Sequence, residues 1–281
     1  MASIPGYAGR IRTALVAVPE CASESGEPSM TSTIDYALND SVGTLTIRRE
    51  NKHNALGAAE LDGIEDVIDT VIADAEIRAL VVTGEGEKTF CAGAALDDLE
   101  SGRISPARFQ AAMERLATVS VPTIARINGS VFGGGTELAL SCDFRIGVRG
   151  MRLRVPAASL GLCYPPAGIK RFVERLGKNV ARRALVASET LSADELFRTG
   201  FLDYLVDPPV LDERVDELTM HLAGLAPLAV AAMKELVRDA ERGVMDEKRA
   251  SGLARRCAES EDLSEGLAAQ KEKRSPRFAG R

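Results

Sequence analysis

The stretch SVFGGGTELALSCDF, residues 130–144, places three glycines directly before a threonine, a glutamate and an apolar run. A strand-like segment, VPTIARING at 121–129, precedes the glycines, and another, CDFRIGV at 142–148, ends the stretch. Residues 135–142 have the character of a short helix. The order strand, glycine turn, helix, strand predicts a right-handed βαβ unit with parallel strands.

The same alternation continues on both sides of this stretch. Strands are predicted at 41–49, 77–84 and 201–207, and helices at 61–72, at 106–118, from about 167 onward and throughout 211–273. The helix at 61–72 places six apolar side chains on one face: Leu61, Ile64, Val67, Ile68, Val71 and Ile72. The pattern predicts an α/β fold with a helical C-terminal region.

Composition limits the classes of function. The chain has 281 residues, 45% of them hydrophobic, and a formal net charge of −6. An acidic chain lacks the basic face that general nucleic-acid binding needs, and no segment has the length and apolar character of a membrane span. The five cysteines are scattered without metal-site spacing, which predicts reduced thiols and a cytoplasmic protein.

We expect three parts along the chain. Residues 1–31 are rich in Ser, Pro and Glu and are predicted to be a disordered extension, with Met30 as a candidate start. Residues 32–210 are predicted to form the α/β core that holds the binding site. Residues 211–281 are predicted to form the C-terminal helical region.

The glycine run lies where α/β folds bind ligands, between the end of a strand and the start of a helix. Glycines let a ligand approach the backbone, and an N–H group at a helix start can stabilise a developing oxyanion. Glu137 falls in the first helical turn beside these groups, where it can take up a proton. The alternative interpretation is a tightly packed helix start whose glutamate pairs with the helix dipole. The run matches neither the dinucleotide-binding fingerprint nor the P-loop.

A second small-residue turn, CAGAA, lies within KTFCAGAALDDLE at 88–100, after the strand at 77–84. Two such turns can supply two convergent N–H groups. Together the two stretches resemble the enoyl-CoA hydratase/isomerase (crotonase) superfamily, and the resemblance extends over about residues 33–279. Further matching segments are NKHNALGAAEL (51–61), ASLGLCYPPAGIKRFVERLG (158–177), SADELFRTGFLDYLVD (192–207) and EGLAAQKEKRSPRF (265–278).

The resemblance implies a fold, a substrate class and a set of site residues. The implied fold is a spiral of ββα units with a C-terminal helical region that forms trimers, often paired into hexamers. The implied substrate is an acyl-CoA thioester, with coenzyme A as part of the substrate and no separate cofactor or metal. The implied oxyanion donors are the N–H groups of Ala92 and Gly134. The implied or candidate coenzyme A contacts are Lys52, His53, Ala55, Ala94, Lys273 and Phe278.

The typical hydratase of this family uses two glutamates, and this chain keeps one of them. Glu137 matches the first, but Ala157 follows Pro156 where the second glutamate is typical. Alanine cannot move a proton, so hydration by two glutamates is not expected.

Three interpretations remain open. The first is isomerisation or an atypical hydration with Glu137 as the single acid/base. The second is decarboxylation of a malonyl-type thioester, because Tyr164 resembles a carboxylate-orienting tyrosine of the methylmalonyl-CoA decarboxylase branch; a packing role for Tyr164 is the alternative. The third is a protein that binds acyl-CoA without catalysis.

Overall fold

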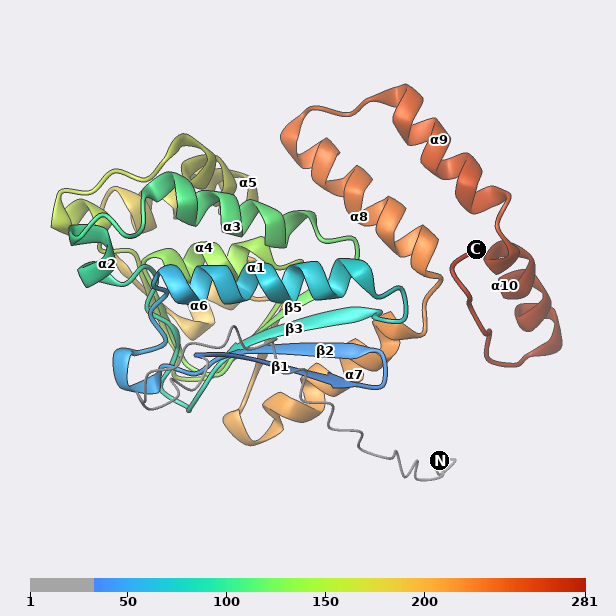
Figure 1. The fold of residues 1–281 in the computed structure, drawn as a ribbon, viewed down its shortest axis with the longest axis horizontal. Helices are drawn as coiled ribbons and strands as arrows, with labels where there is room; N and C mark the ends of the chain where they lie inside the picture. Colours follow the sequence, from blue (N-terminus) through green and yellow to red (C-terminus); the bar gives the residue numbers. More distant parts are fainter. Residues whose placement is uncertain (1–32) are drawn as a thin grey trace, which may run out of the picture.

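A six-stranded β-sheet forms the centre of the computed structural model, which describes residues 33–281 (Figure 1). Its strands, in spatial order, are β1 Ile34–Asn39, β2 Val42–Ile47, β3 Ala79–Gly84, β5 Thr123–Ile127, β7 Phe144–Val148 and β10 Tyr204–Val206. β1 pairs antiparallel with β2, and all other neighbours are parallel, which confirms the predicted parallel arrangement. The predicted extension at 1–31 lies outside the described residues.

A second sheet consists of four strands of three residues each. In spatial order they are β4 Thr89–Cys91, β6 Ser130–Phe132, β8 Arg152–Arg154 and β9 Thr190–Ser192. Along the chain β3 and β4, β5 and β6, and β7 and β8 are each followed by a helical segment. This repeat agrees with the ββα units that the resemblance implies.

Helices cover both faces of the larger sheet. α1 (Ala58–Ala73) and α3 (Pro106–Thr118) lie on one face, and α7 (Leu211–Ala223) lies on the other (Figure 1). The remaining helical segments of this part are η1 Glu50–Lys52, α2 Leu96–Glu100, α4 Gly134–Ser141, η2 Ala157–Leu160, α5 Pro166–Leu185, α6 Ala193–Arg198 and η3 Pro208–Val210. Five of the six apolar residues predicted on one face of α1 are buried, whereas Ile72, at the edge of the apolar stripe, is exposed.

The core includes α7. This helix buries Leu211, Val215, Leu218 and Leu222, and it packs against β7 and β5. The predicted boundary at residue 210 therefore moves to the end of α7, because the apolar face of the helix needs the sheet as its partner.

Three helices extend away from this core: α8 Pro227–Arg242, α9 Glu247–Ala258 and α10 Glu261–Glu272 (Figure 1). Ion pairs tie α8 to the core, one of them between Arg175 on α5 and Glu241 on α8, at 3.3 Å. Lys234 Nζ lies 2.6 Å from Asp143 Oδ2, and Arg242 Nη1 lies 2.7 Å from Glu114 Oε1. The three helices and their connections expose large apolar side chains, namely Met233, Val237, Val244, Leu263 and Leu267.

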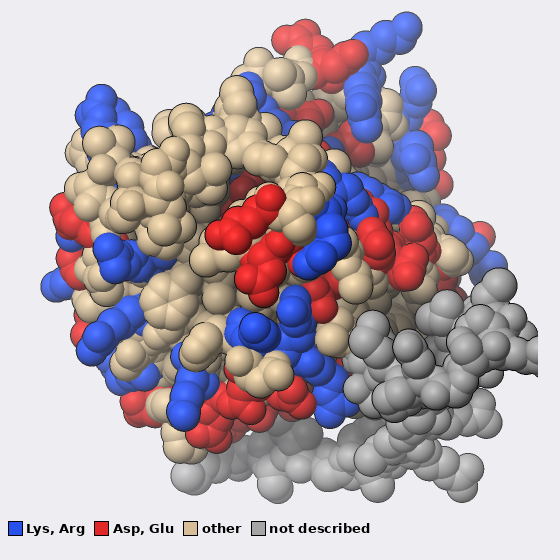
Figure 2. Space-filling model, turned by 60° about the vertical axis from the view of Figure 1, so that its left-hand side comes forward, with Lys and Arg blue, Asp and Glu red and all other residues tan. Residues whose placement is uncertain are grey.

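The surface charge is mixed. On the face in Figure 2, the described Lys and Arg side chains are interspersed with Asp and Glu. Within residues 33–281, no single helix is both long and apolar enough to span a membrane; only a pair, 208–223 with 227–242, meets that test, and it is bent by 106°.

Candidate active site

A cavity of about 110 Å³ lies where α3, α4, the turn after β4 and the segment 156–165 meet. Most of its lining is apolar, with Leu96, Leu99, Phe109 and Leu160 among the larger side chains. The cavity brings together six residues singled out in the sequence: Ala92, Ala94, Gly134, Glu137, Ala157 and Tyr164. Two turns that are about forty residues apart in the chain thus line one cavity.

Glycines allow the two turns to pack against each other. Gly93 has a φ of +88°, and a Cβ atom there would lie 2.3 Å from the backbone nitrogen of Gly134. A Cβ atom on Gly135 would lie 2.2 Å from the carbonyl oxygen of Cys91. Gly133, which precedes α4, has a φ of +51°. The glycine run is therefore required for both a turn and a close approach of two backbone segments.

The structure corrects one predicted oxyanion donor. The N–H group of Ala92 already donates a hydrogen bond to the carbonyl oxygen of His53, at 3.0 Å. The N–H groups of Ala94 and Gly134 have no hydrogen-bond partner among the described residues. Gly93, in a left-handed conformation between the two alanines, turns the chain so that their N–H groups face different neighbours. Ala94 and Gly134 are therefore the donors available to a ligand.

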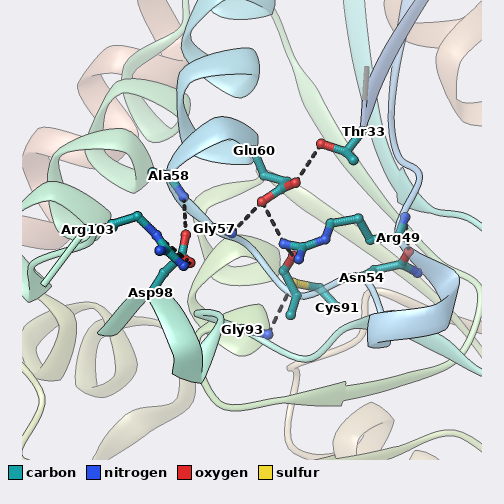
Figure 3. A network of polar contacts seen from close by, with 11 residues as sticks. Thr33, Arg49, Asn54, Gly57, Ala58, Glu60, Cys91, Gly93, Asp98 and Arg103 are labelled. Atoms are coloured by element: carbon teal, nitrogen blue, oxygen red, sulfur yellow. Dashed lines mark hydrogen bonds and ion pairs between the residues drawn. The ribbon is translucent and has the colours of Figure 1, made fainter. Parts of the chain in front are cut away.

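A buried carboxylate supports the segment beside the first turn (Figure 3). Glu60 accepts hydrogen bonds from the Gly57 N–H at 2.6 Å, from Arg49 at 2.7 Å and from the Thr33 hydroxyl at 2.6 Å. Arg49 also donates to the carbonyl oxygen of Ala55, at 2.9 Å. This network fixes the start of α1 against the loop that contains the predicted coenzyme A contacts.

Asp98 gives a second connection in the same region (Figure 3). It accepts a hydrogen bond from the Ala58 N–H at 2.9 Å and pairs with Arg103, and these contacts lower the pKa of its carboxyl. The thiol sulfur of Cys91 accepts the N–H of Gly93 at 3.3 Å. Burial raises the pKa of Cys91 to about 12, which suits a structural thiol rather than a nucleophile.

Glu137 is the only carboxylate among the described residues that line the cavity. It lies in the first turn of α4 and is 2% exposed, and its Oε1 atom has no hydrogen-bond partner among the described residues. Burial raises the pKa of Glu137, although the charge of Arg171 and the amide of Gln110 work in the opposite direction. A carboxyl group with a raised pKa beside two free N–H donors is suited to proton transfer.

Tyr164 also lines the cavity. Its ring packs edge-on against Phe172 with 5.6 Å between the ring centres, and the hydrogen bonds within residues 33–281 include none to its hydroxyl. Burial and the neighbouring charge of Glu137 raise the pKa of Tyr164, so it stays a neutral hydroxyl. Ala157, in η2, is buried and presents only a methyl group to the cavity.

The predicted coenzyme A contacts fall into two groups. Lys52, His53 and Ala55 belong to the loop that bonds to the first turn, so they lie next to the site. Lys273 and Phe278 do not meet the site within one chain. The carbonyl oxygen of Phe278 accepts a hydrogen bond from Arg78, just before β3, at the end of the strand opposite to the cavity. Lys273 and Phe278 lie far from the cavity of their own chain because they follow α8–α10, which extend away from the core (Figure 1).

Comparison with known proteins gives the family. Residues 37–281 match the sequence model described as enoyl-CoA hydratase/isomerase. The short-chain-enoyl-CoA hydratase of Clostridium acetobutylicum is 31% identical over 243 residues, covering 83% of this chain and 92% of that protein. The carnitinyl-CoA dehydratase of Proteus mirabilis is 34% identical over 240 residues, covering 82% of this chain and 92% of that protein.

Solved structures agree with this. The crystal structure of an enoyl-CoA hydratase from Bacillus anthracis matches with a TM-score of 0.81 at 30% identity, and the match covers 89% of this chain and 100% of that one. A crystal structure of an enoyl-CoA hydratase from Mycobacterium tuberculosis matches with the same TM-score, 0.81, at 26% identity, and the match covers 89% of this chain and 100% of that one. The chain therefore belongs to the enoyl-CoA hydratase/isomerase family, whose members act on acyl-CoA thioesters.

Proposed function

We propose that this enzyme is an isomerase that shifts the double bond of an acyl-CoA thioester from C3=C4 to C2=C3. Glu137 is its single acid/base. The observation that supports this most directly is the cavity lining, which combines one carboxylate, two residues with free N–H groups and otherwise mostly apolar side chains. Such a lining suits the transfer of one proton along a hydrocarbon chain.

The proposed reaction needs no second carboxylate. The thioester oxygen accepts hydrogen bonds from Ala94 and Gly134, each contributing about 3–4 kcal/mol to stabilising the enolate. The carboxylate of Glu137 takes the proton from C2, and the electrons of that C–H bond form the enolate, whose negative charge lies on the thioester oxygen while the C3=C4 bond is still intact. When Glu137 delivers the proton to C4, the thioester carbonyl re-forms, C2=C3 becomes the double bond and the C3=C4 electrons form the new C4–H bond. The atoms balance without adding or losing water.

Hydration requires more from the site. A water molecule must be deprotonated at the oxygen that attacks C3 while another proton is delivered to C2, and two glutamates divide this work in the typical hydratase. Ala157 offers neither a base nor an acid at the second position. The names of the relatives, hydratase and dehydratase, thus agree with the substrate class but do not require the same reaction here.

Decarboxylation of a malonyl-type thioester is the second candidate. It is favoured by Tyr164, which lines the cavity as a neutral side chain and whose hydroxyl has no hydrogen-bond partner among the described residues. In this reaction the oxyanion donors stabilise the enolate left when carbon dioxide departs, and Tyr164 orients the carboxylate that leaves.

The test is turnover of three coenzyme A thioesters by the purified protein: a 2-enoyl, a 3-enoyl and a methylmalonyl-type ester. The Glu137→Gln and Tyr164→Phe variants are measured alongside. We expect turnover of the 3-enoyl ester that falls about 10²–10⁴-fold in Glu137→Gln. Turnover of the methylmalonyl ester that depends on Tyr164 would favour decarboxylation. Binding of all three without turnover would leave a binding protein.

We also propose that the protein is a trimer, or a hexamer of two trimers. The exposed apolar side chains of α8–α10 and the distance of Lys273 and Phe278 from their own site support this proposal. In such an assembly those two residues would reach the coenzyme A of another copy, and Lys52 and His53 would contact it from the same chain.

A further inference from the structure

The buried side of α3 carries one amide among apolar side chains. Gln110 lies next to Phe109 and one turn from Met113, both of which are buried. The oxygen and the nitrogen of the Gln110 amide are both shielded from solvent, and neither makes a well-aligned hydrogen bond with a described residue. A leucine would fill a similar volume without leaving two polar atoms unpaired, so packing alone does not account for the amide.

The Gln110 amide approaches the carboxyl group of Glu137. A Cβ atom placed on Gly168 would lie 3.2 Å from Gln110 Oε1, 3.3 Å from Glu137 Oε2 and 3.2 Å from Cδ1 of Tyr164. Side chains from α3, from α4 and from the segment before α5 thus converge over one glycine, which has no side chain to separate them. The other oxygen of Glu137, Oε1, is also buried and unpaired among the described residues.

We propose that Gln110 is a positioning residue that holds the carboxyl group of Glu137 in both of its protonation states. This proposal rests on the proposed role of Glu137 as the acid/base. The amide NH₂ can donate to the carboxylate, and after a half-turn the amide oxygen can accept from the protonated carboxyl. The proton itself moves only between the substrate carbons and Glu137. Gln110 keeps its own protons throughout.

The charged and titratable neighbours of Glu137 come from several elements. Arg171 on α5 lowers the pKa of Glu137, and Glu114 on α3 raises it. Tyr164 is neutral and faces the same space. Gln110 also lowers the pKa of Glu137, although its amide does not meet the geometry of a good hydrogen bond in the resting structure. Gln110 is therefore the uncharged contributor that favours the ionised carboxyl, the form that removes a proton from substrate.

The experiment compares Gln110→Leu with the wild type by two readouts. The first is a ¹³C NMR titration of Glu137 in protein with labelled glutamate, its signal assigned by its loss in Glu137→Gln. We expect the midpoint of the titration to move to a higher pH, at which the proton concentration is about tenfold lower. The second is the pH profile of kcat with the 3-enoyl ester, whose acidic limb moves in the same direction while the Kd for a saturated acyl-CoA stays within about twofold.

Two further variants complete the design. Gln110→Met keeps an unbranched side chain of similar length, and it replaces Gln110→Leu if that variant does not fold. Arg115→Ala, on the outer side of the same helix, removes only a surface ion pair with Asp69 and should change neither readout. An unchanged titration midpoint of Glu137 in both Gln110 variants overturns the proposal. If the wild type turns over no thioester, the proposed function fails, but the titration still decides the role of Gln110.

Discussion

At the scale of single residues, the burial of Glu137 links stability to pH. Its pKa is raised in the folded chain above the ordinary value of 4.5. Protonated Glu137 therefore contributes its full share to the free energy of unfolding below pH 4.5. This contribution is lost as the pH rises through the pKa that Glu137 has in the folded chain. Glu137→Gln cannot ionise, so we expect it to raise the Tm at pH 8 by about 2–4 °C. The gain should shrink toward pH 4.5. Thermal unfolding at both pH values measures it, and a lower Tm at pH 8 would contradict the prediction.

Gly93 is a second residue with a specific consequence. Its φ of +88° strains any other residue, and a Cβ atom would strike the nitrogen of Gly134 at 2.3 Å. We expect Gly93→Ala to lower kcat/KM by about 10²–10³-fold, as the loss of one oxyanion donor does. Gly150→Ala is the matched control, since Gly150 has the same φ of +88° with nothing within 4 Å of its Cβ position. It should lose stability but keep its activity; equal activity losses in both would point to strain alone.

Ala157 offers a test by gain of function. The residue is buried in η2 and lines the same cavity as Glu137. Ala157→Glu supplies the second carboxyl that hydration needs, so we expect hydration of the 2-enoyl ester to rise at least about tenfold over the wild type. The added activity should disappear in the double variant with Glu137→Gln. Formation of the 3-hydroxyacyl product is followed by chromatography, and wild-type hydration equal to that of the variant would count against a single-carboxylate site.

The sequence predicts some of these residues and not others, for physical reasons. Glu137 is predictable as a candidate because GGGTE matches the glycine–glutamate motif of the family, whereas the spacing alone also allows a glutamate that only pairs with the helix dipole. Ala94 is not distinguishable from Ala92, because the direction of each N–H group depends on the left-handed turn at Gly93. Gln110 lies in a helix 27 positions before Glu137, and only the packing of α3 on α4 and α5 brings the two side chains together.

At the scale of elements, α8 is fastened to the core through Glu114. Its carboxylate accepts hydrogen bonds from Arg242 on α8, at 2.7 and 3.0 Å, and from Arg171 on α5, at 2.7 Å. Arg171 also bonds to the hydroxyl of Ser141, which in turn donates to the carbonyl oxygen of Glu137 at 2.8 Å. Continuous contacts therefore run from the C-terminal helices to the turn that carries the acid/base.

We expect Glu114→Gln to loosen α8. The substitution leaves the buried Arg171 and the half-buried Arg242 without their carboxylate, at a cost of about 1–3 kcal/mol in the free energy of unfolding. Hydrogen exchange should accelerate in α8 more than in α1. Asp69→Asn is the control, because it breaks an exposed ion pair with Arg115. Unchanged exchange in α8 would show that Lys234 and packing hold the helix without Glu114.

The predicted elements are confirmed where they are long. α3 has the predicted bounds of 106–118, and the helix predicted at 61–72 lies within α1. The strands of the second sheet are absent from the prediction because three residues are too few to show a period of two. β1 is also missing from the prediction, because IDYALN is short and Ala37 places an apolar side chain where the alternation needs a polar one.

At the scale of the whole molecule, the helices that leave the core predict an assembly. Leu267 is 61% exposed and Met233 is 59% exposed, and the proposed assembly would cover this apolar surface. We expect light scattering to give three or six times the chain mass. Leu267→Glu should shift the mass toward one chain and weaken acyl-CoA binding, because Lys273 and Phe278 would lose the neighbouring site. A measured mass equal to that of one chain for the wild type would contradict the assembly.

In the proposed reaction Glu137 alone transfers the proton from C2 to C4 of the acyl chain. The most direct measurement follows a 3-enoyl-CoA ester by NMR with wild-type enzyme and with Glu137→Gln. We predict that the wild type forms the 2-enoyl ester without accumulating a 3-hydroxyacyl product, and that the variant forms almost none. Isomerisation by Glu137→Gln at the wild-type rate, or a 3-hydroxyacyl ester as the main wild-type product, would contradict the claim.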